Sequence, residues 1–124
     1  MNRKEFNVYL EHVLTRTKDV LGAKGDEYSY NGGAFENFEE GVGLGFSNSR
    51  EAVAWGYAVK HIQAVLAMLN RVEVGDSTHL SEKLIEEKCG DVINYMILIE
   101  AMLKERVDNN KKLEEWSKQM QLNM

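Results

Sequence analysis

Residues 92–99, Val-Ile-Asn-Tyr-Met-Ile-Leu-Ile, decide the fold class, because they are apolar nearly all round. A helix with that pattern is buried among other elements. The β-branched residues also suit a strand, but the length of the pattern over residues 81–106 and its charged first turns favour a helix. Continued to residue 103, the stretch is interrupted by Asn94 and Glu100 and is shorter than the roughly 20 residues of a membrane span. We therefore predict a buried bundle helix and no membrane contact.

Three further helices are predicted on either side of it. Residues 2–21 have apolar positions three and four apart, with a cap signature at Asn2 and Glu5 and a stop at Gly22. Residues 49–70 follow a second cap signature at Asn48 and Glu51, and residues 108–121 form a final helix. Its apolar face suggests an oligomerisation element and comprises Leu113, Trp116 and Met120.

The helix over residues 49–70 carries two stripes. The large apolar stripe comprises Trp55, Val59, Ile62, Leu66 and Leu69. The small-residue stripe, which would admit a backbone or a ligand, comprises Ala52, Gly56, Lys60, Ala64 and Ala67. We expect this helix to be central, and the whole chain to be an all-α bundle of four to five helices.

Length and composition indicate one domain. The chain has 124 residues and a mass of 14.2 kDa, with its core expected over about residues 2–106. It contains no proline, which excludes collagen and proline-rich linkers. The net charge of −5, with no basic run, argues against binding to duplex nucleic acid. A single cysteine, Cys89, excludes an internal disulfide, and the charged N-terminal residues lack a signal core, so a cytoplasmic location is expected.

Residues 24–47 hold an unusual share of the glycines and aromatic residues. A stretch of this length without a long helix is typical of a functional loop. We predict a short helix over residues 34–40 and a segment folded over one end of the bundle. Phe38 reads as a core anchor, whereas Lys24, Tyr28 and Asn37 suit a pocket that stacks a base and reads its edge.

Two acidic groups suggest a metal site. Glu87, Asp91 and Asn94 share one helical face, and Glu36 with Glu39 forms an E-x-x-E step. Brought together, the four carboxylates could hold Mg²⁺ against a phosphate chain. The alternatives are a solvated acidic face and pairing of Glu87 and Asp91 with nearby lysines.

Lys60 and His61 interrupt an otherwise apolar helix. Lys60 could meet a phosphate or Asp91, or extend from the edge of the core into water. His61 could contribute to a ligand site or be a hydrogen-bonded core residue.

The order of these motifs resembles the phage and prophage proteins called nucleotide modification associated domain type 1. The resemblance covers about residues 20–105 and rests on Lys24, Glu27-Tyr28, Asn37-Phe38, Trp55-Gly56, Lys60-His61, Glu87 and Gly90-Asp91 to Asn94-Tyr95. It implies a setting of nucleotide metabolism in a bacterial host more than a particular reaction.

The second half also resembles the all-α nucleoside triphosphate pyrophosphohydrolases of the MazG and dimeric dUTPase type. This resemblance implies Mg²⁺ held by an E-x-x-E and an E-x-x-D step, with Asp91 as the aspartate. The sequence departs from that pattern, because Lys88 stands three before Asp91 and Glu87 lies one residue early.

Three hypotheses follow. The first is a Mg²⁺-dependent hydrolase of a nucleotide phosphoanhydride, with Glu87, Asp91 and Lys60 catalytic and Glu36 and Glu39 completing the metal site. The ligand would be held by Lys24, Tyr28, Asn37, Phe38, His61 and Asn94. The second is a phage-type module that binds a linear or cyclic nucleotide without chemistry, either to sequester an immune signal against host defence or to modulate a partner. The third is a structural oligomer without a ligand. A homo-oligomer is expected in each case.

Overall fold

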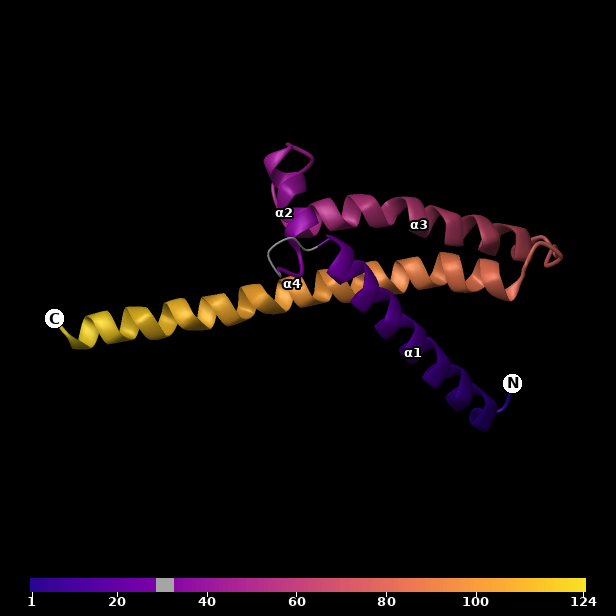
Figure 1. Cartoon of the computed structure of the whole chain (residues 1–124), viewed down its shortest axis with the longest axis horizontal. Helices are drawn as coiled ribbons and strands as arrows, with labels where there is room; N and C mark the ends of the chain where they lie inside the picture. The colour runs from indigo at the N-terminus through magenta and orange to yellow at the C-terminus, as the bar shows by residue number, and fades with distance from the viewer. Residues whose placement is uncertain (29–32) are drawn as a thin grey trace.

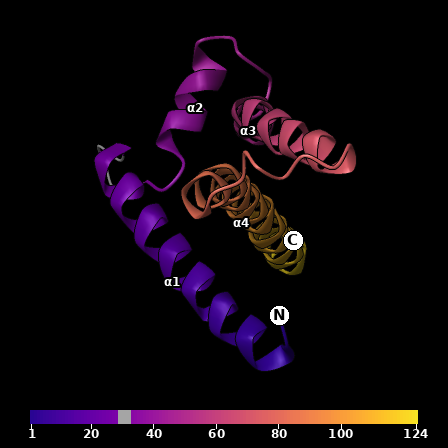
Figure 2. The same cartoon turned by 90° about the vertical axis from the view of Figure 1, so that its right-hand side faces the viewer.

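The computed structural model describes the backbone of residues 1–28 and 33–124, and the side chains of residues 1–22 and 33–124. These residues form four helices and no strand: α1 (Arg3–Tyr28), α2 (Glu36–Gly43), α3 (Arg50–Glu73) and α4 (Glu82–Leu122). α3 and α4 run side by side as a hairpin, α1 crosses α4, and α2 covers the end of the hairpin where α3 begins (Figures 1 and 2). The predicted all-α bundle, with part of the glycine-rich segment folded over one end, is confirmed.

The helix starts follow from their caps. The Asn2 side-chain oxygen accepts a hydrogen bond from the backbone N–H of Glu5 at 2.8 Å, as the sequence predicts. The second cap is one residue later than expected, because the Ser49 hydroxyl, and not Asn48, accepts from the Ala52 N–H at 3.2 Å. Such a bond satisfies one of the free N–H groups in a first helical turn.

Two predicted helix ends are wrong. α1 passes through Gly22 and continues to Tyr28, because an isolated glycine costs a helix interior only about 1 kcal/mol. The separate helix predicted over residues 108–121 is the second half of α4, which runs unbroken from its Ser81 cap. The ion pair between Lys104 Nζ and Asp108 Oδ1, at 2.6 Å, spans the predicted break.

The buried core is small and lies where α2, α3 and α4 meet. Phe38, Val53, Ala54 and Met102 form its centre. Helices α2 and α3 approach closely there, since a Cβ on Gly41 would lie 2.6 Å from Val53 Cγ1. The core therefore requires a glycine at position 41.

Much of α3 faces outward in the single chain. Its buried residues are Val53, Ala54, Ala58 and Met68, and most of the large apolar stripe predicted to be central is exposed. By length and composition alone, α3 could also cross a membrane, a test that core helices of soluble proteins pass as well. The absence of membrane contact and the cytoplasmic location remain predictions.

Candidate functional site

The α3–α4 hairpin brings His61 against Asp91. Their facing atoms, Nδ1 and Oδ2, lie 3.2 Å apart, and both side chains are about one quarter exposed. Tyr95, one turn beyond Asp91, stacks on the imidazole with ring centroids 5.4 Å apart and an interplanar angle of 25°. A carboxylate at one imidazole nitrogen orients the ring and leaves the other nitrogen to serve a ligand.

The stacked pair is one end of a continuous row of rings. Phe38 of α2 lies 6.4 Å from Tyr95 and 6.0 Å from Tyr57, measured between ring centroids. Phe46 lies 6.5 Å from Tyr57 in an edge-on arrangement. We call the five rings the aromatic row: Phe46, Tyr57, Phe38, Tyr95 and His61. Phe38 is buried at its centre, as a core anchor would be, whereas Phe46 and Tyr57 are exposed.

Lys60 adds a positive charge next to His61. It is exposed, and no ion pair holds it within the part of the chain that the structure describes. The sequence suggested that Lys60 could contact Asp91, but Asp91 contacts His61 instead. The Lys60 ammonium group is therefore available to an anion that approaches the aromatic row.

The predicted acidic groups lie in different places. Glu87 is exposed and pairs with Lys88 at 3.3 Å, one of the alternatives considered above. Glu39 Oε1 pairs with Arg50 Nη1 at 3.0 Å, and the same Nη1 lies 3.3 Å from Glu105 Oε1. Glu105 is about 21 Å along α4 from Asp91, at about 1.5 Å per residue. Glu39 and Asp91 are therefore too far apart to share one ion within a chain.

The described residues do not fit the implied magnesium site. They contain no group of three or more His, Cys, Asp or Glu residues that could hold a metal ion. Asp91, the best match to the pyrophosphohydrolase pattern, faces a histidine where that pattern would need a second carboxylate. Glu36 lies at the start of α2, and its side chain packs beside Gly33.

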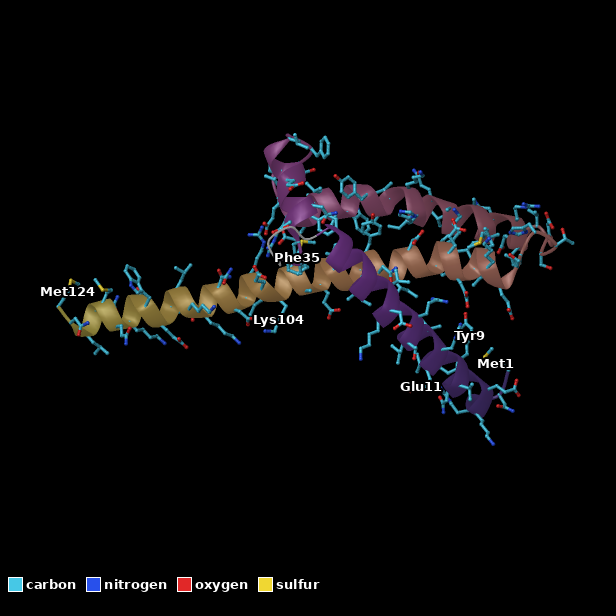
Figure 3. The ribbon with its side chains drawn as sticks, viewed as in Figure 1. Met1, Tyr9, Glu11, Phe35, Lys104 and Met124 are labelled. Carbon is cyan, nitrogen blue, oxygen red and sulfur yellow. The ribbon has the colours of Figure 1, made fainter. Side chains whose placement is uncertain are left out.

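An arginine joins three helices at the other side of the core. Arg50 begins α3, pairs with Glu39 of α2 and donates from Nη2 to the Met102 carbonyl of α4 at 3.3 Å. Its guanidinium also lies 5.1 Å from the centre of the Phe35 ring, and Figure 3 shows Phe35 where α2 meets α4. The glutamates around Arg50 raise its pKa above the ordinary value, although burial opposes this.

Next to Arg50, Glu51 forms a two-pronged ion pair with Arg106 of α4. Arg106 Nε and Nη2 donate to the two carboxylate oxygens at 2.6 and 2.8 Å. These bonds lower the pKa of Glu51 to about 2. Neither arginine stood out in the sequence, because each is an isolated cation whose partners are far away along the chain.

Asn94 lies on the part of α4 that packs against α1. Gly90, one turn earlier on the same face of α4, packs against the Arg16 guanidinium of α1. Asn94 Oδ1, Arg16 Nη1 and the Thr17 hydroxyl are buried atoms without a hydrogen-bond partner among the described residues. Such groups are usually bridged by internal water.

Three further predicted ligand residues lie on α1 and α2. Asn37 is partly buried on α2. The backbone of Lys24 and Tyr28 belongs to α1, but their side chains lie outside the described residues.

Three residues of the aromatic row, Phe46, Tyr57 and Tyr95, were not among the predicted site residues. For the two tyrosines the signal was a spacing of four, because Tyr57 precedes His61 by one turn and Tyr95 follows Asp91 by one turn. No family model, curated protein or solved structure matches the chain, so both family resemblances remain predictions.

Proposed function

We propose that the protein binds a nucleotide at the exposed edge of the aromatic row and holds it without hydrolysis. The observation that carries the proposal is His61, stacked on Tyr95 and paired with Asp91. An imidazole held in this way presents one ring nitrogen in a set direction, which suits a hydrogen bond to a base or a phosphate.

The surrounding groups suit the other parts of a nucleotide. Tyr57 is partly exposed and lies between two further rings of the row, which gives a base a surface for stacking. Lys60 supplies a cation for the phosphate. That cation matters in a chain of net charge −5, which otherwise repels an anionic ligand.

The ion pairs of the carboxylates favour binding of a nucleotide without its hydrolysis. Hydrolysis of the pyrophosphohydrolase kind needs several carboxylates around Mg²⁺, and Glu39 and Glu87 are paired with Arg50 and Lys88. In the setting that the resemblance implies, a phage protein of this kind would sequester a nucleotide signal of the bacterial host.

A second candidate function is hydrolysis by general-base catalysis. The contact between His61 and Asp91 favours it, because a carboxylate behind an imidazole is how enzymes orient a histidine that takes a proton. Only the second function would convert the bound nucleotide into a hydrolysis product.

Titration calorimetry with ATP, dUTP and a cyclic dinucleotide tests the proposal, in EDTA and again with Mg²⁺. We expect binding of at least one nucleotide in EDTA and no product by chromatography after incubation. His61→Ala and Lys60→Ala should each weaken that binding about tenfold, the value of one lost stacking or charged contact.

Lys118→Ala is the matched control, because Lys118 is an exposed lysine on the far part of α4. Its affinity should equal that of the unaltered chain, and circular dichroism should show all variants folded. Absence of binding across the panel, or unchanged affinity in folded His61→Ala, would rule the proposal out. Turnover lost in His61→Ala would instead establish the second candidate.

A further inference from the structure

The second half of α4 extends beyond the rest of the chain. The core ends at Met102, and the residues beyond Asp108 are exposed (Figures 1 and 3). A group of apolar side chains nevertheless lines one face of this extension. We call it the tail stripe, and its members Leu113, Trp116 and Met120 are 62%, 61% and 48% exposed.

The tail stripe repeats the face that α4 uses in the core. Leu113, Trp116 and Met120 each follow a core-facing residue by eighteen positions, which is five full turns of about 3.6 residues. Those core-facing residues are Tyr95, Leu98 and Met102, which form or pack against the centre of the core. The tail stripe is thus in register with a face that, about 27 Å earlier, is covered by α2 and α3.

A second apolar surface is uncovered on α3. It consists of Trp55, Leu66 and Leu69, which are 50%, 51% and 56% exposed, with the partly buried Ile62 between them. We call it the α3 stripe. It extends for about 21 Å along its helix, about twice the length of the tail stripe, so the tail stripe can lie wholly on it.

The total solvent-accessible surface area shows how much surface remains for a partner to bury. A folded chain of this mass typically exposes about 6,800 Å², whereas this one exposes 9513 Å². A standard interface buries roughly 800 Å² on each partner, so a surplus of about 2,700 Å² exceeds what one stable dimer contact requires.

We infer that a second copy of this chain covers both stripes, with the tail stripe of each copy packed on the α3 stripe of the other. The continuity of the tail stripe with the core face indicates that it fits a helix like α3. Within one chain, α3 lies beside the first half of α4 and does not reach the tail stripe (Figure 1). A reciprocal exchange gives two equal contacts and a closed twofold dimer.

Sedimentation equilibrium of the full chain tests the inference with one variant on each surface. The unaltered chain should be a dimer. Trp116→Glu and Leu66→Glu should each weaken dimerisation at least tenfold, because each places a charge at the centre of an apolar contact. The matched control is Leu122→Glu, because Leu122 is 85% exposed on the opposite side of α4 from the tail stripe.

Mixing the two variants distinguishes this arrangement from other dimers. A mixed pair retains one intact contact, between Trp116 of one copy and Leu66 of the other, so the mixture should dimerise more strongly than either variant alone. Pairing of one tail stripe with another would leave Leu66→Glu dimeric and give no rescue, which overturns the inference. A monomeric unaltered chain, or a dimer insensitive to Trp116→Glu, also overturns it.

Discussion

At the scale of residues, His61 and Asp91 show what the sequence could and could not predict. The cost of burying an unpaired charge indicates that Asp91 needs a partner. The candidates in the sequence were a lysine, a metal ion and solvent. The partner is His61, thirty positions earlier, which only the register of α3 against α4 determines. The stacking of Tyr95 on His61 could not be predicted either, because the sequence pattern shows only that Tyr95 belongs to an apolar stripe.

The ion pair between the mostly buried Glu51 and the half-exposed Arg106 predicts how stability depends on pH. The pKa of Glu51 is lowered from 4.5 to about 2, with hydrogen bonding to Arg106 as the main cause. A carboxyl group with a lowered pKa stabilises the folded state fully above its unfolded pKa. That contribution should therefore be lost as the pH falls from about 4.5 toward 2. The full pKa shift corresponds to about 3 kcal/mol, and solvent screening at the half-exposed Arg106 reduces this to about 2 kcal/mol.

Urea unfolding between pH 2 and 7 measures this contribution. Glu51→Gln should lower the free energy of unfolding at pH 7 and make it less dependent on pH below 4.5. Glu100→Gln, which changes an exposed glutamate of α4, the helix that carries Arg106, should keep the full acid dependence. Parallel pH curves for Glu51→Gln and the unaltered chain would show that the pair contributes no stability.

At the scale of elements, the sequence predicts where helices exist better than where they end. Periodic apolar residues and cap side chains are local signals, and they placed all four helices. The ends of α1 and α4 were missed because Gly22 and the polar stretch near Asn109 weaken a helix without breaking it. The outward position of the α3 stripe was missed because periodicity indicates which residues share a face but not which neighbour covers it.

Two glycines on neighbouring helices provide a test of the α2–α3 contact. A Cβ at Gly41 would collide with Val53, whereas a Cβ at Gly56 on α3 would meet no atom within 4 Å. Gly41→Ala should therefore destabilise the protein by about 1–3 kcal/mol through overpacking. Gly56→Ala should stabilise it by about 0.5–1 kcal/mol, because alanine favours the helix.

Thermal unfolding at low protein concentration measures both changes. Opposite shifts of the midpoint are expected for the two alanines. Equal shifts would mean that α2 does not pack against α3 at Gly41.

At the scale of the whole molecule, the chain is an extended arrangement of helices around a small core. Hydrophobic residues make up 44% of the chain, which suggested enough apolar side chains for a full core. The residues of the tail stripe suggested an oligomer. What the sequence could not indicate is the surplus of exposed surface, because it depends on how the helices are placed. The same holds for the candidate site, whose rings come from α2, α3, α4 and the loop between α2 and α3, and meet only in the folded chain.

The central claim, nucleotide binding beside His61, is tested most directly by NMR of the histidine and tyrosine rings in the full chain. Helix α1 carries an internal control, since Tyr9 and His12 form another tyrosine–histidine pair, with ring centroids 6.1 Å apart. On adding ATP, dUTP or a cyclic dinucleotide, the signals of His61 and Tyr95 should shift with at least one of them, while those of Tyr9 and His12 stay in place. Shifts confined to the α1 pair, or no shift with any of the three nucleotides, would contradict the claim.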